Sequence, residues 1–148
     1  MGTGCAGLND VASVSRYEDL IAWQLAYELQ REVFALTETG SAAKDFKFRD
    51  QIRDSSSSAT RNIAEGFGRY GPAEFARFLN IARGSLTETH NSLRDGRDRG
   101  YFTAIDTDRL QRLAGRSAKA TTGLIRYLES CVRRNRRTWR PHHSPRTP

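Results

Sequence analysis

Residues 110–131 read LQRLAGRSAKATTGLIRYLESC, and their pattern decides the fold. Small or apolar side chains recur there at alternating steps of four and three residues, namely Leu110, Ala114, Ser117, Thr121, Leu124, Leu128 and Cys131. Such a heptad seam is typical of a helix that packs against other helices at a shallow angle. Thr103, with Asp106 three residues later, has the form of a capping box that would start this helix. The stretch therefore predicts a long helix in a helical bundle.

Three further helical patterns precede this stretch. They cover about residues 17–38, 43–67 and 72–99, with glycine-containing breaks at residues 40–41, 68–71 and 100. Pro72 suits the first turn of a helix, where an N–H has no partner in any case. A chain of 148 residues is long enough for one core. We therefore predict an all-α, antiparallel up-down-up-down four-helix bundle over residues 16–132, after a flexible leader at residues 1–15.

The expected first helix has two apolar faces. One consists of Leu20, Trp23, Tyr27 and Phe34, and the other of Ile21, Leu25, Leu29, Val33 and Leu36. A surface helix of a monomer needs only one such face, so the second must meet another part of the bundle or another subunit. We take Ile21, Leu25, Leu29 and Val33 as candidates for a contact between identical chains in a homo-oligomer.

Four consecutive serines, Ser55–Ser58, occupy the centre of the expected second helix. Serine is a poor helix former because its hydroxyl competes for backbone hydrogen bonds. If the third helix folds back about a turn near Tyr70, Ser55 lies opposite Ser85 and beside Gly84. Small side chains then meet across the hairpin and allow close packing. A nucleophilic role is disfavoured, because no base stands at a suitable spacing from these serines.

The positive charge is concentrated near the C-terminus. The formal net charge is +7, yet residues 1–130 contain 18 basic and 17 acidic side chains. Residues 131–148 contain six arginines and no acid, and we expect residues 133–148 to form a disordered arginine-rich tail. Such a tail could neutralise the phosphates of a nucleic acid or could serve only as a solubilising extension. Its candidate contacts are Arg133, Arg134, Arg136 and Arg137.

The residue patterns of common enzymes are missing from the chain. There is no phosphate-binding loop, nucleophile elbow or zinc spacing, and His90 follows Glu88 at the wrong distance for a di-metal bundle site. We expect no enzyme activity, no metal and no cofactor. Cys5 and Cys131 do not suggest a disulfide framework. Without a signal-peptide pattern or a long apolar run, the expected location is cytoplasmic, with no membrane association.

Several short motifs resemble one known family. They are YEDLIAWQ at residues 17–24, QIR at 51–53, RNIAEGFGR at 61–69 and EFARFLNIARGSLTE at 74–88. In this order they are similar to the four-helix-bundle family once called S23 ribosomal protein, whose members are encoded by intervening sequences in 23S rRNA genes. Accessory proteins of diversity-generating retroelements form a related branch. The resemblance covers about residues 16–131 and is weaker at 54–60, where serines replace a more apolar run.

The resemblance implies a cyclic pentamer of four-helix bundles with no known catalytic activity. It also implies a nucleic-acid role, and the retroelement branch assists a reverse transcriptase. Two functions therefore stay open. The chain is an RNA- or DNA-associated module of the rRNA intervening-sequence type, or it is an oligomeric scaffold or adaptor for a protein partner such as a reverse transcriptase. The candidate nucleic-acid contacts on the bundle are Arg61, Arg69, Arg77 and Arg83.

The motif residues favour a structural role. They are Asn62, Glu65, Gly66, Phe75, Phe78, Gly84, Ser85 and Glu88. Asn62 and Glu65 lie three positions apart and share a helix face, so we expect them to tie the second helix to the third or to an adjacent subunit. Glu88 is expected to meet Arg53 across the same hairpin.

Overall fold

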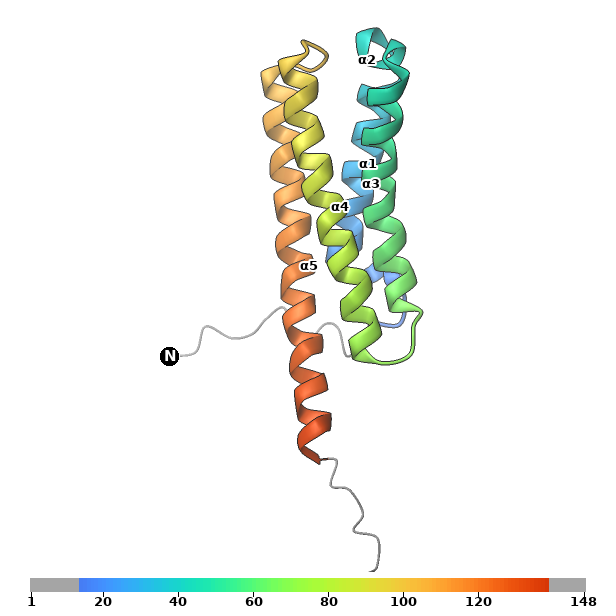
Figure 1. Ribbon diagram of the computed structural model, residues 1–148, viewed down its shortest axis with the longest axis vertical. Coiled ribbons are helices and arrows are strands. Elements are labelled where there is room, and N and C mark those ends of the chain that lie inside the picture. Colours follow the sequence, from blue (N-terminus) through green and yellow to red (C-terminus); the bar gives the residue numbers. More distant parts are fainter. Residues whose placement is uncertain (1–13, 139–148) are drawn as a thin grey trace, which may run out of the picture.

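The computed structural model describes residues 14–138 (Figure 1). A 3-10 turn at Tyr17–Asp19 precedes five α-helices. These are α1 (Ile21–Leu36), α2 (Gly40–Lys44), α3 (Phe46–Phe67), α4 (Pro72–Asp98) and α5 (Ala104–Thr138). The four long helices lie side by side, and the short α2 lies at one end of them (Figure 1). No strand occurs in residues 14–138, so the predicted all-α class is confirmed for this part of the chain.

Each long helix packs against two others. Helix α4 lies between α3 and α5, and α1 contacts α3 and α5 on the other side. Hydrogen bonds between α3 and α4 join Ser55 to Thr89 and Ser58 to Ser85, so residue numbers rise along one helix as they fall along the other. Large, fully buried side chains from all four long helices form the core: Leu29, Val33, Ile52, Ile63, Leu79, Leu86, Leu93 and Leu110.

Helix α1 uses most of its second apolar face inside the chain. Leu29 and Val33 are fully buried, so the prediction that they contact another subunit is wrong. Leu25 is half-buried and packs against the same core, whereas Ile21 remains 57% exposed. The apolar surface of α1 is wide because the helix packs against both α3 and α5.

Asp45 divides the second predicted helix into α2 and α3. Its carboxylate accepts a hydrogen bond from the Phe48 backbone N–H at 3.2 Å, which caps the start of α3. The same carboxylate accepts bonds from the Tyr101 hydroxyl at 2.7 Å and from Arg99 at 3.2 Å. Asp45 thereby connects the start of α3 to the loop between α4 and α5. We call these contacts of Asp45 the corner. Local periodicity cannot predict it, because Tyr101 and Arg99 are distant from Asp45 in the chain.

The contacts at this corner shift the pKa values of two groups in opposite directions. The hydrogen bond from Tyr101, followed by the bond from the Phe48 N–H, lowers the pKa of the Asp45 carboxyl below its ordinary value of 3.8. The bond to Asp45 raises the pKa of the Tyr101 hydroxyl above its ordinary value of 10.0, because only the protonated hydroxyl can donate. Between pH 3.8 and pH 10.0, therefore, the Asp45 carboxylate is ionised and the Tyr101 hydroxyl is protonated, as their hydrogen bond requires.

The hairpin of α3 and α4 lies about one helical turn from its predicted register. Ser85 bonds Ser58 at 2.8 Å, whereas the prediction placed it opposite Ser55. The close contact next to the turn fixes this register. Gly66 packs so tightly on Phe78 that a Cβ added to the glycine would stand 2.7 Å from the Phe78 Cβ.

Two of the four consecutive serines face the core. Ser55 and Ser56 are buried, and their hydroxyls donate to the carbonyl oxygens of Ile52 at 3.2 Å and of Arg53 at 3.0 Å. Each hydroxyl therefore bonds the carbonyl oxygen three residues earlier in its own helix. In the described residues, every buried side-chain nitrogen and oxygen has a hydrogen-bond partner. The serine run is thus compatible with a close-packed helix.

Helix α5 begins as predicted but ends later. The Asp106 N–H donates to the Thr103 hydroxyl at 3.1 Å, which confirms Thr103 as the capping residue. The helix continues to Thr138, and its end projects beyond the neighbouring helices (Figure 1). The predicted disorder is therefore wrong for residues 133–138, where arginines near the C-terminus favour the helix through its dipole. The rest of the predicted tail, 139–148, and residues 1–13 of the predicted leader lie outside the described residues.

Candidate nucleic-acid interface

The arginines predicted on the bundle are mostly engaged within the chain. Three of them lie close to a carboxylate on their own helix or its adjoining turn: Arg61 at 3.6 Å from Asp54, Arg69 at 2.6 Å from Glu65 and Arg77 at 3.2 Å from Glu74. The fourth, Arg83, donates to Asn80 at 2.9 Å. A phosphate at the first three sites would compete with a carboxylate that already offsets the positive charge. These arginines are therefore poor candidates for the main contact with a polyanion.

Arg69 and Arg77 also have a structural task. Their guanidinium groups lie 5.1 Å and 4.8 Å from the centre of the Phe78 ring. Phe78 is the ring against which Gly66 packs near the turn between α3 and α4. The two arginines thus cover an aromatic side chain at this end of the hairpin.

Asn62 and Glu65 act within α3 and do not join it directly to α4. The Asn62 side-chain amide donates to the Ser58 carbonyl at 2.8 Å and to the Ser58 hydroxyl at 3.1 Å. Because Ser58 bonds Ser85, Asn62 supports the hairpin through an intermediate. Glu65, on the exposed side of α3, pairs with Arg69 in the turn that follows the helix. The predicted direct tie is therefore wrong within the chain.

The predicted pair of Glu88 and Arg53 is also wrong. Arg53 faces α1, where it donates to the Thr37 hydroxyl at 2.8 Å and lies 4.7 Å from the centre of the Phe34 ring. Glu88 lies on the exposed side of α4. Spacing along one helix did not distinguish the side that faces α1 from the side that faces α4.

The remaining motif residues divide into a buried group and one exposed glycine. Gly66, Phe75, Phe78 and Ser85 are buried between α3 and α4, as their structural reading requires. Gly84 differs, because it is exposed and a Cβ built on it meets nothing within 4 Å. The close packing predicted beside Gly84 is therefore not found within the chain.

Helix α5 has a basic surface of which the sequence analysis named only the four arginines at residues 133–137. Between residues 112 and 137 there are eight basic side chains and one acid, Glu129, which is a surplus equal to the net charge of the whole chain, +7. All eight are exposed. We define the cationic ridge as the basic side chains that share the outer side of α5: Arg112, Arg116, Lys119, Arg126, Arg133 and Arg137. Its signal in the sequence was the seven-residue spacing of Arg112, Lys119, Arg126 and Arg133.

The ridge differs from Arg61, Arg69 and Arg77 because no carboxylate offsets its charge. In residues 14–138, no member of the ridge forms an ion pair with a carboxylate. In contrast, Arg109 at the start of α5 lies 3.1 Å from Glu32 of α1, and Asp108 lies 3.7 Å from Arg97 of α4. Carboxylates therefore neutralise the first turns of α5 and leave the rest of its outer side positive.

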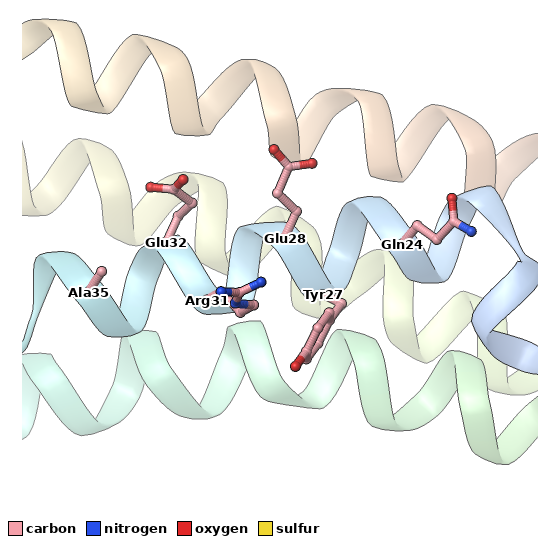
Figure 2. A pocket seen from close by; sticks show the side chains of 6 residues that line it. All are labelled: Gln24, Tyr27, Glu28, Arg31, Glu32 and Ala35. Carbon is pink, nitrogen blue, oxygen red and sulfur yellow. The ribbon is translucent and has the colours of Figure 1, made fainter.

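A surface depression follows α1 on another side of the bundle (Figure 2). Its lining residues are Gln24, Tyr27, Glu28, Arg31, Glu32 and Ala35. Figure 2 shows Glu28 and Glu32 pointing toward α5 and Tyr27 pointing toward α3. The lining contains carboxylates and a guanidinium but no histidine, cysteine or serine, so it offers neither a serine or cysteine nucleophile nor an imidazole base.

Two further kinds of feature are missing from the described residues. No three His, Cys, Asp or Glu side chains there are grouped so that they could hold a metal ion. None of the helices in residues 14–138 combines the length and the apolar character needed to cross a membrane. Cys131 is a half-buried free thiol whose sulfur lies 3.3 Å from Arg134.

Comparison with known proteins agrees with the motifs. The family model described as 23S rRNA-intervening sequence protein matches residues 18–123, which include α1 to α4 and the first part of α5. No curated protein matches the chain. The matched region contains Arg112, Arg116 and Lys119 and ends before Arg126. Because the match covers more than half of the 148 residues, the chain belongs to the 23S rRNA-intervening sequence protein family.

Proposed function

We propose that this chain is a non-enzymatic, RNA-associated protein of the rRNA intervening-sequence type. It acts in the cytoplasm as a cyclic homo-oligomer of antiparallel up-down-up-down bundles, for which the family resemblance implies five subunits. The observation that carries the RNA role is the distribution of charge. The exposed side chains of α5 between residues 112 and 137 have a net charge of +7, and the chain belongs to the family described as 23S rRNA-intervening sequence protein.

A concentrated, unpaired cationic surface favours a polyanion for a physical reason. Each phosphate that a lysine or arginine neutralises releases condensed counterions, and this release drives binding. An arginine that already has a carboxylate partner contributes little to this effect. In a ring of identical chains the surplus is repeated by symmetry, which strengthens the field that an approaching RNA meets.

The RNA role is tested by an electrophoretic shift assay with a structured ribosomal RNA fragment. We expect binding that weakens steeply between about 50 and 200 mM salt, because phosphate contacts dominate the affinity. Absence of a shift at the lower salt would contradict the RNA role and would leave the scaffold function, with a protein partner, as the better proposal.

Self-association is tested separately by native mass spectrometry. Among the predicted contact residues Ile21 is exposed and Leu25 is half-buried, so they remain candidates for the contact. We expect Ile21→Asp to give smaller species, since a carboxylate would be desolvated at an apolar contact. Ile105→Asp is the matched control, because Ile105 is 80% exposed near the start of α5. If the two variants have the same mass distribution as the unchanged chain, Ile21 lies outside the interface.

A further inference from the structure

We infer that the cationic ridge of α5 is the surface that holds RNA, and that it takes the backbone of double-stranded RNA by charge and shape. This inference rests on the proposed function and adds the form of the partner and the residues that contact it. It shares Arg133 and Arg137 with the sequence-based expectation, but that expectation placed the contacts of the bundle on α3, α4 and the turn between them.

The geometry of the ridge suits a rigid, extended polyanion. An α-helix turns by about 100° per residue, so side chains seven positions apart differ in direction by about 20°. Arg112, Lys119, Arg126 and Arg133 therefore lie nearly in line. With a rise of about 1.5 Å per residue, the distance from Arg112 to Arg137 is about 37 Å. Duplex RNA offers regularly spaced phosphates over such a length, whereas a single strand must be straightened first.

Two glycines between the basic positions point to close approach by a partner. Gly115 and Gly123 are exposed, and a Cβ built on either meets nothing within 4 Å. Neither has a positive φ, so the backbone does not require glycine there. Glycine is a poor residue inside a helix, and the fold gains no contact from it. The two glycines leave low points between Arg112, Lys119 and Arg126 where a phosphate backbone can come near the helix.

The aromatic side chains favour a duplex over a single strand. Proteins that hold single strands without sequence preference stack bases on aromatic rings. In the described residues the exposed aromatic side chains are Tyr27, Phe34, Phe46 and Tyr70, and none of them is on α5. Tyr127 of α5 is half-buried and packs against the core. The ridge therefore offers charge without a stacking platform, which suits a helix whose bases are already stacked and paired.

An anionic lipid surface carries the same phosphate chemistry, but the ridge suits it less well. Helices that lie on membranes insert large apolar side chains beneath the headgroups. Between residues 112 and 137 no large hydrophobic side chain is exposed. The ridge thus has the basic side chains of a membrane-binding helix but lacks the large exposed apolar side chains.

The test is fluorescence anisotropy with the full-length chain. The probes are an RNA duplex of about 20 base pairs, one of its strands alone, and vesicles of phosphatidylcholine with phosphatidylserine. The ridge variant combines Arg112→Gln, Lys119→Gln and Arg126→Gln. The control combines Lys47→Gln, Arg61→Gln and Arg94→Gln, three exposed positions on α3 and α4. Both variants lose two arginines and one lysine, so their net charges are equal.

We expect the unchanged chain to bind the duplex more tightly than the strand. The ridge variant should lose about a hundredfold in duplex affinity at about 0.1 M salt, and the slope of log affinity against log salt should fall by about 3. The control should stay within about threefold of the unchanged chain. Thermal unfolding and native mass of both variants should match those of the unchanged chain, because all six side chains are exposed.

The other outcomes are distinguishable. Equal losses in the ridge variant and the control would overturn the inference and leave the proposed RNA function intact. Tighter binding of the single strand, or ridge-dependent binding of vesicles without RNA binding, would overturn it as well. If the ridge variant unfolds, charge-retaining Arg126→Lys and single Arg126→Gln variants take its place, and equal affinities of these two would count against the ridge. If the unchanged chain binds no RNA, the proposed function itself fails.

Discussion

At the scale of single residues, two helical glycines have opposite surroundings. A Cβ on Gly96 would overlap the ring of Phe102 and stand 2.8 Å from the ring of Phe48, whereas a Cβ on Gly115 meets nothing within 4 Å. We expect Gly96→Ala to lower the free energy of unfolding by about 1–3 kcal/mol through overpacking. Gly115→Ala should raise it by about 0.5–1 kcal/mol, because alanine is the better helix former. Thermal unfolding followed by circular dichroism measures both, and shifts of the same sign would contradict the packing of Gly96.

The corner at Asp45 predicts a defined pH dependence. Because the pKa of Asp45 is lowered in the folded chain, its contribution to stability is present at neutral pH and is lost as the pH falls below 3.8. Because the pKa of Tyr101 is raised, its contribution is lost as the pH rises above 10.0. Tyr101→Phe should therefore melt at a lower temperature than the unchanged chain, and the difference should shrink at both pH limits.

Tyr70→Phe is the control for this comparison. Tyr70 is 100% exposed, so its hydroxyl has no buried bond to lose. Its melting temperature should follow that of the unchanged chain at every pH. A difference between Tyr101→Phe and the unchanged chain that stays constant below pH 3.8 would argue against the bond to Asp45.

At the scale of helices, the end of α5 separates stability from binding. Leu128 is the last buried side chain of α5 in the described residues, and positions 133–137 are exposed. A chain that ends at residue 132 should therefore melt within about 2 °C of the full chain. Leu128→Ala should lose about 2–4 kcal/mol, because it leaves a cavity in the core. The same truncation should weaken RNA binding, since it removes Arg133 and Arg137 from the ridge. A large loss of melting temperature on truncation would mean that the last turns of α5 support the bundle.

The sequence predicted the long helices better than their contacts. Periodicity and the breaks near Gly40, Gly71 and Gly100 located α3, α4 and α5 to within a few residues, except for the late end of α5. It missed the division at Asp45, because that cap depends on Tyr101 and Arg99 from a distant loop. It misjudged the hairpin register, which a tertiary contact at Gly66 sets. Periodicity alone shows which side chains share a face of a helix, but it does not show which neighbouring helix packs against that face.

At the scale of the whole molecule, the pairing of a basic side chain matters as much as its exposure. Arg61, Arg69 and Arg77 are exposed as expected, but their carboxylate partners on the same helix or its adjoining turn offset their charge. The part of the ridge from Arg112 to Arg126 was overlooked because residues 1–130 are nearly neutral as a group, and an average conceals a local surplus. Where each charge stands on the folded surface decides which side meets a polyanion.

The separation of charge on this surface also gives the molecule a direction. A chain whose surplus of +7 stands between residues 112 and 137, while the remainder is balanced, has a large electric dipole moment across the bundle. Near a polyanion such a molecule experiences a torque as well as an attraction. It turns α5 forward before contact, which raises the fraction of collisions that are productive. Salt should therefore slow association by weakening this alignment, in addition to weakening the bound state.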